Sequence, residues 1–133
     1  MTVLDHVTVT VPAAAFDRAA AFYDAALGAL DLVRVAELVD EEEGDAALES
    51  VGWGPPDGAG LVWLVIGELP TTGLHVRLRA DSRVQVESFH SEAVRAGGAG
   101  HSEPRRWALY RRGEFNAIVA DPAGNLVEAV AAE

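Results

Sequence analysis

The chain has 133 residues, half of them hydrophobic, a formal charge of −11 and no cysteine. This length suits one compact domain, and the lack of cysteine excludes disulfides, thiolate nucleophiles and sulfur-ligated metal sites. The acidic charge disfavours nucleic acid and anionic membranes as partners. No apolar run approaches the roughly 18 residues of a membrane span. The opening MTVLDHVTVTV lacks the regions of a signal peptide, so we expect a cytoplasmic protein.

The first half of the chain begins with LDHVTVTV (4–11), in which polar and apolar residues alternate as in a half-buried strand. FDRAAAFYDAAL (16–27) has apolar residues at helical spacing, and Gly28 is suited to end that helix. The acidic segment 40–45 and the turn-rich segment 54–60 then divide a series of strands. These predicted strands are 32–38, 47–53 and 61–67.

The second half repeats this order after the linker ELPTTG (68–73). LHVRLRA (74–80) predicts a strand, and RVQVESFHSEAVRA (83–96) predicts a helix with Ser82 as its N-cap and Gly97 at its end. The segment 99–113 is irregular, with one weak strand. The predicted strands after the helix are 99–103, 114–120 and 125–131.

The repeat indicates an α+β fold made of two βαβββ modules. We expect a single domain over 1–133, with module 1 at 1–67 and module 2 at 74–133. The two half-sheets would join into an eight-stranded, incompletely closed cup of mixed strands with the helices outside. Asp121 to Gly124 has the chemistry of a type I turn and joins the last two strands.

Equivalent positions of the two modules suggest a functional site. Aligning the first strands places His6 against His75, and aligning the last strands places Trp63 against Glu128. A carboxylate buried without a partner in so apolar a strand would cost several kcal/mol or become protonated. One arrangement that satisfies these groups is a shared divalent metal held by two imidazoles and one carboxylate. Such a set leaves coordination positions open for water or substrate.

The segments LDHVTVTV, AFYDAALG, LHVRLRA, FHSEAVRAGG and FNAIVADPAGNLVEAV resemble the vicinal-oxygen-chelate superfamily of glyoxalases, bleomycin- and fosfomycin-resistance proteins and extradiol dioxygenases. The resemblance implies that His6, His75 and Glu128 bind one divalent ion (Fe, Zn, Ni or Mn), and that the protein is a homodimer. Glyoxalases of this kind typically have a fourth protein ligand, a carboxylate, where this chain has Trp63. Extradiol dioxygenases also use a second-sphere His and a Tyr, for which no position here matches well.

Further residues are candidates for contact with a small-molecule substrate. Glu128 and Tyr110 are candidate catalytic residues, and Tyr110 occupies a position where many small members carry a Tyr before the final hairpin. Trp63, Arg77 and Tyr110 are candidate substrate-binding residues, because ligand pockets use aromatic walls and arginine clamps anions. Arg77 and Arg79 are both expected to point into the cup, and the alternative for each is a surface or Glu-paired arginine.

Three functional hypotheses follow. The first is a metal-dependent enzyme, a lyase or a dioxygenase, in which the metal chelates two oxygens of a small substrate and acts as a Lewis acid. The second is a metal-free, drug-sequestering binding protein of the bleomycin-resistance type. The third is a degenerate member with a structural or regulatory role.

Overall fold

The computed structural model describes residues 3–40, 47–106 and 113–132. The elements of its first half are β1 (Val7–Val11), a 3-10 turn (Ala13–Ala15), α1 (Phe16–Gly28), β2 (Val33–Asp40), β3 (Ala47–Gly54) and β4 (Val62–Ile66). The elements of its second half are β5 (His75–Arg79), α2 (Arg83–Arg95), β6 (Ala99–Arg106), β7 (Glu114–Ala120) and β8 (Leu126–Ala132).

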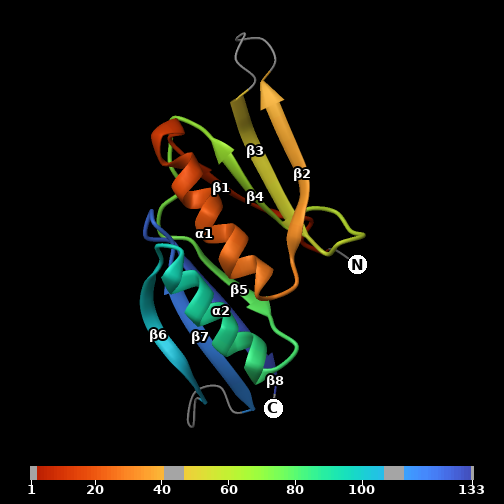
Figure 1. Ribbon diagram of the computed structural model, residues 1–133, viewed down its shortest axis with the longest axis vertical. Coiled ribbons are helices and arrows are strands. Elements are labelled where there is room, and N and C mark those ends of the chain that lie inside the picture. Colours follow the sequence, from red (N-terminus) through yellow and green to blue (C-terminus); the bar gives the residue numbers. More distant parts are fainter. Residues whose placement is uncertain (1–2, 41–46, 107–112, 133) are drawn as a thin grey trace.

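The strands form two four-stranded sheets with the same topology. Their orders are β1-β4-β3-β2 and β5-β8-β7-β6. In each sheet the first and last strands of the module pair in parallel, and the other neighbours are antiparallel. Figure 1 shows the first module in the upper half of the molecule and the second in the lower half, with both helices on one face. The predicted α+β fold of two βαβββ modules is confirmed.

Local chemistry sets the ends of α2 and of the last hairpin. The Ser82 hydroxyl accepts a hydrogen bond from the Gln85 backbone N–H at 3.2 Å and caps the helix start. Gly97 follows the helix with φ of 105°, a conformation that favours glycine. Gly124 has φ of 92°, and its N–H donates to the Asp121 carbonyl at 2.9 Å, which closes the predicted turn.

Each helix covers one face of its own sheet, and the alternation of the strands supplies the matching apolar side chains. Val9, Leu64 and Trp53 are buried beneath α1, whereas Val127 and Ala129 are buried in β8, which contacts α2. The two helices also contact each other. The opposite face of each sheet, which we call its open face, therefore carries the residues that alternate with these core positions.

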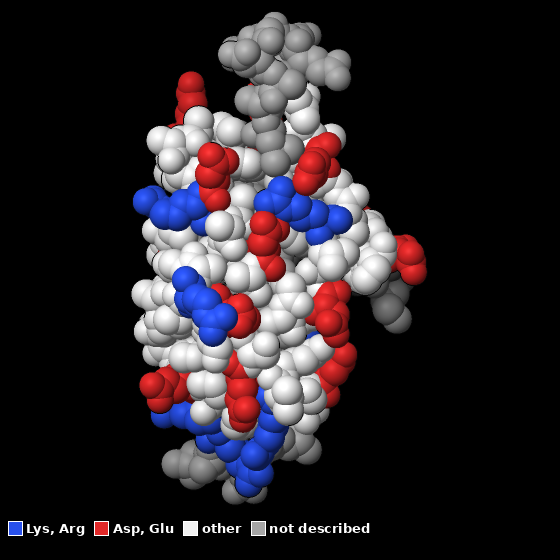
Figure 2. All heavy atoms as spheres, viewed as in Figure 1, with Lys and Arg blue, Asp and Glu red and all other residues white. Residues whose placement is uncertain are grey.

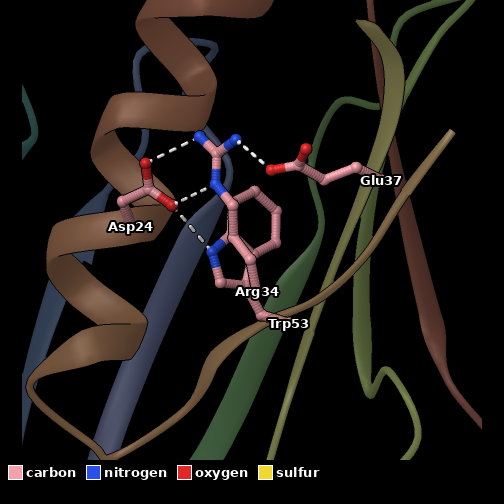
Figure 3. Close-up of polar contacts among 4 residues, drawn as sticks. All are labelled: Asp24, Arg34, Glu37 and Trp53. Carbon is pink, nitrogen blue, oxygen red and sulfur yellow. Dashed lines mark hydrogen bonds and ion pairs between the residues drawn. The ribbon is translucent and has the colours of Figure 1, made fainter. Parts of the chain in front are cut away.

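A polar cluster joins α1 to β2 and β3 (Figure 3). Asp24 of α1 accepts hydrogen bonds from Arg34 Nε at 2.8 Å and Arg34 Nη2 at 2.7 Å. The indole N–H of the buried Trp53 donates to the same carboxylate at 2.9 Å, and Arg34 also donates to Glu37 at 3.1 Å. The hydrogen bonds that Arg34 donates to Asp24 are the first cause of the raised pKa of Arg34. Trp53 is thus a core residue with a satisfied polar atom.

Buried hydrogen bonds also join the two modules. The Tyr23 hydroxyl on α1 donates to Asp121 in the β7–β8 turn at 2.6 Å. Asn125 donates from its amide to the Thr71 carbonyl in the linker at 2.9 Å and accepts from the Leu74 N–H at 3.0 Å. Burial, followed by the Asp121 carboxylate, raises the pKa of Tyr23, so the phenol stays protonated and keeps donating.

Charge is dispersed over the face that carries the helices. Acidic side chains lie among basic ones over the whole of this face (Figure 2). Neither of the helices in the described ranges is long and apolar enough to cross a membrane.

Candidate functional site

The open face of the second module brings two of the predicted metal ligands together. His75 begins β5, and Glu128 lies on the neighbouring β8. His75 Nε2 and Glu128 Oε1 are 2.8 Å apart. Because an ionised carboxylate only accepts hydrogen bonds, Nε2 carries the proton in this arrangement. Glu128 is only 3% exposed, while the His75 side chain is 43% exposed, so the pair is reachable from the histidine side.

The second carboxylate oxygen of Glu128 is held from two other strands. Asn116 Nδ2 of β7 donates to Oε2 at 2.7 Å, and Arg77 Nε of β5 lies 3.1 Å from it. Arg77 also donates to Glu114 at 2.7 Å. Burial by itself raises the pKa of Glu128, but the hydrogen bonds from Asn116, Arg77 and His75 lower it below its usual value. The carboxylate is therefore ionised and fixed in orientation.

The first module repeats this arrangement with a different chemistry. In the parallel pairs, Thr8 lies beside Trp63 and Arg77 lies beside Glu128. His6 and His75 each come two residues before the paired position, so the strand register reproduces the predicted alignment of the modules. The rings of His6 and Trp63 meet edge to face with centroids 6.4 Å apart. The indole of Trp63 thus lies next to His6 in the first module. In the second module the equivalent position, next to His75, holds the carboxylate of Glu128.

Glycines make room for the indole of Trp63. A Cβ added to Gly52, its partner on β3, would lie 2.8 Å from the ring, and one added to Gly60 would lie 2.7 Å from Nε1. Both distances are shorter than real side chains show. The indole therefore packs closely against the backbone at Gly52 and Gly60, and it forms an aromatic surface on the open face of the first module.

The predicted ligand set is brought together only in part. Within the described ranges, no three His, Asp or Glu side chains form a group that could hold a metal ion. His75 and Glu128 are adjacent, whereas the His6 ring contacts Trp63 and donates a hydrogen bond from Nδ1 to Asp5 at 2.6 Å. Tyr110, the other predicted catalytic and substrate-binding residue, lies outside the described residues.

The donor pair itself fits a divalent ion. Two ligands that each lie about 2.1 Å from one ion are about 3 Å apart at octahedral angles and about 3.4 Å apart at tetrahedral ones, so the 2.8 Å between His75 Nε2 and Glu128 Oε1 would widen slightly around an ion. Asn116 and Arg77 hold the other carboxylate oxygen, in the manner of the outer groups that orient metal ligands. His75 and Glu128 would thus supply two of the three ligands of the expected site.

Arg79 continues the open face of β5 beyond this pair. With Arg77, Glu114, Val130 and Ala132 it lines a hollow of about 140 Å³. Arg77 forms ion pairs with Glu114 and Glu128, which corresponds to the Glu-paired alternative expected from the sequence. The side chain of Arg79 makes no hydrogen bond or ion pair with any other residue that the structure describes. Arg79 is therefore the arginine of this strand that is available to an anion.

Sequence reasoning missed Asn116 and Glu114. Both alternate with the buried Phe115 and Ala117, so the strand pattern of EFNAIVA already placed them on one face. The signal for Asn116 was an amide side chain within an apolar strand, since a buried polar side chain almost always has a hydrogen-bond partner. Its partner is Glu128.

Comparison with known proteins agrees with this fold. A family model described as a glyoxalase-like domain matches residues 6–130. A glyoxalase/bleomycin resistance protein from Albidiferax ferrireducens T118 is 24% identical, with a TM-score of 0.72 over 96% of this chain and 97% of that chain. A glyoxalase/bleomycin resistance protein/dioxygenase family enzyme from Burkholderia phytofirmans PsJN is 15% identical, with a TM-score of 0.67 over 99% of this chain and 100% of that one.

A glyoxalase-related enzyme from Fulvimarina pelagi is 15% identical, with a TM-score of 0.64 over 97% of this chain and 88% of that one. These likenesses show a shared fold. No curated protein matched the sequence. The family match spans both modules, including His6, His75 and Glu128, and the chain belongs to the glyoxalase-like domain family.

Proposed function

We propose that this protein is a metal-dependent enzyme that acts on a small oxygenated substrate. The observation that carries the proposal is the pairing of His75 with a buried, ionised Glu128 on an open sheet face. A buried carboxylate that is oriented by Asn116 and Arg77 and remains reachable through a half-exposed imidazole suits metal binding better than a purely structural role.

The third ligand in this proposal is His6 of a second copy of the chain. His6 occupies the position equivalent to His75, and its side chain is 43% exposed on the other module. In a symmetric homodimer, the first module of each chain would face the second module of its partner and form two identical sites. Each site would then contain two imidazoles and one carboxylate.

The two open faces would form unlike walls of the cup. The first module contributes the aromatic surface of Trp63, and the second contributes the polar side chains of His75, Arg77 and Arg79. A ligand that lies between them would place a flat or apolar part on the indole and its oxygens toward the second module. Two neighbouring oxygen atoms of the substrate could then both bind the same metal ion.

The bound metal would supply a Lewis acid that polarises the substrate oxygens. The residues of the chain have separate tasks. Asn116 and Arg77 hold Glu128 in one orientation, Trp63 positions the substrate body and excludes water, and Tyr110 is proposed to hydrogen-bond the substrate.

A metal-free binding protein is the second candidate, and one observation favours it. The charge of Glu128 is already balanced by Arg77, and both of its oxygens have partners without any metal. In that case the cup would be a pocket that sequesters a ligand on Trp63, as the second hypothesis from the sequence proposes.

Metal content distinguishes the two candidates. We expect protein purified without chelator, and reconstituted with Fe, Zn, Ni or Mn, to bind close to one ion per chain. His75→Ala and Glu128→Gln should each lower this stoichiometry by at least about tenfold, since each removes a ligand. His90→Ala is the matched control, because His90 lies on α2 and faces Gly100. Wild-type protein that binds no ion after reconstitution would refute the enzyme proposal and favour the binding protein.

A further inference from the structure

A second hollow lies where the two modules meet, away from the open face of the second module. Its volume is about 240 Å³. The end of β1, the first turns of α1, the linker and the β7–β8 turn each contribute to its wall. Its lining is mostly apolar and includes Pro12, Pro70 and Pro122. None of the residues discussed above as metal ligands or substrate contacts lines it.

Hydrogen bonds hold the walls of this hollow in place. The linker residue Thr71 donates from its N–H to the Thr10 carbonyl at 2.9 Å, and its hydroxyl accepts from the Thr10 N–H at 2.8 Å. Asn125 donates to the Thr71 carbonyl, and Ala123 donates to Asp121 at 2.9 Å. The linker is therefore tied to both modules, and the hollow exists without a ligand, as most small-molecule sites do.

Arg18 gives this hollow a specific chemistry. Its side chain lines the hollow beside Ala15 and Ala19. The side chain of Arg18 is exposed and makes no hydrogen bond, ion pair or ring contact with another residue in the described part of the chain. In a chain with a charge of −11, most arginines have acidic neighbours available, so one that faces an apolar hollow without a partner is a candidate anion ligand. The hydroxyl of Thr72 offers a second donor at the same wall.

We propose that this hollow binds a small monocarboxylate with an apolar body. The guanidinium of Arg18 would pair with the carboxylate, and the proline and alanine side chains would cover the apolar part. Because the wall includes parts of both modules and the linker, the ligand would bridge the modules. Binding to the folded state alone would raise the unfolding midpoint.

The test is a titration of the full-length, ¹⁵N-labelled protein with cyclohexanecarboxylate, followed by amide chemical shifts. We expect saturable shifts at Ala15, Ala19 and Ala123, and a rise in the unfolding midpoint. Cyclohexanemethanol, the neutral counterpart, should bind at least about tenfold more weakly, because it lacks the charge that pairs with Arg18.

Two variants and one control make the site assignment specific. Arg18→Gln should weaken binding of the carboxylate by about tenfold, and Ala15→Leu should abolish it by filling the hollow. Arg95→Gln removes the same charge from an exposed arginine of α2 that is paired with Glu92, and it should leave binding unchanged. Equal binding of the acid and the alcohol, equal binding by Arg18→Gln and wild type, or shifts confined to β5 and β8 would each overturn the proposal.

Discussion

Glu128 shows how a charged side chain is kept within an apolar strand. Its neighbours Val127 and Ala129 face the core, whereas the carboxylate meets donors from β5 and β7 on the other face. Each such hydrogen bond to a charged group is worth about 1.5–3 kcal/mol, which offsets the cost of burial. The same donors fix the orientation of the carboxylate.

Glu128→Gln should therefore lower the free energy of unfolding by about 1–3 kcal/mol at neutral pH, since it removes the ion pair with Arg77. The pKa of Glu128 is lowered in the folded state, so its contribution is present above the pKa of the unfolded chain and is lost as pH falls through the folded value. The difference between variant and wild type should shrink from about pH 5 to about pH 3.

Urea unfolding at a series of pH values measures this difference. Glu92→Gln, which breaks an exposed pair with Arg95, is the control and should change stability by less than about 0.5 kcal/mol. A difference between Glu128→Gln and wild type that is the same at every pH would contradict the assignment of an ionised Glu128.

At the scale of elements, α1 is one of the parts of the first module that contact the second. Its Tyr23 hydroxyl is buried and donates to Asp121, which also accepts N–H groups of its own turn. The turn therefore depends on a helix that lies about a hundred residues earlier in the chain. The segment DPAGN, which lies within one of the stretches that carry the family resemblance, contributes hydrogen bonds that help to join the modules.

Tyr23→Phe should lower the free energy of unfolding by about 1–3 kcal/mol, because it leaves the buried Oδ2 of Asp121 with only the long, 3.4 Å hydrogen bond from Asn125. Combining it with Asp121→Asn in a double-mutant cycle gives the coupling between the helix and the turn. Thermal or urea unfolding of the four proteins is the measurement. A coupling near zero would mean that the hydrogen bond does not contribute to joining the modules.

The order and type of the helices and strands were predictable from the sequence, but their first and last residues were less so. The helix ends at Ser82 and Gly97 and the strand Glu114–Ala120 follow directly from local chemistry and alternation. β1 begins at Val7, where the prediction began at 4, because its partner β4 starts only at Val62. β6 extends to Arg106 although its side chains are polar and mostly exposed, so no alternating pattern marks it.

At the scale of the whole molecule, the site depends on how the two modules are arranged. The repeat predicts which positions are equivalent, and the strand register confirms that alignment. The repeat cannot predict whether the module that completes the site belongs to the same chain or to a second copy, because the same strand pattern is compatible with both arrangements. Within the described part of one chain, His75 and Glu128 meet but no third ligand joins them. The contacts of Asn116 and Arg77 likewise depend on sheet order rather than on local sequence.

A mixed dimer tests most directly whether two chains share one metal site. Chains carrying His6→Ala and chains carrying Glu128→Gln, each with a different affinity tag, are co-expressed and the mixed species is isolated by both tags. In such a dimer one site lacks both residues and the other is intact. We predict that either variant alone binds almost no metal and that the mixed dimer binds one ion per two chains, half of the wild-type amount. A mixed dimer with no more metal than the single variants would contradict the shared site.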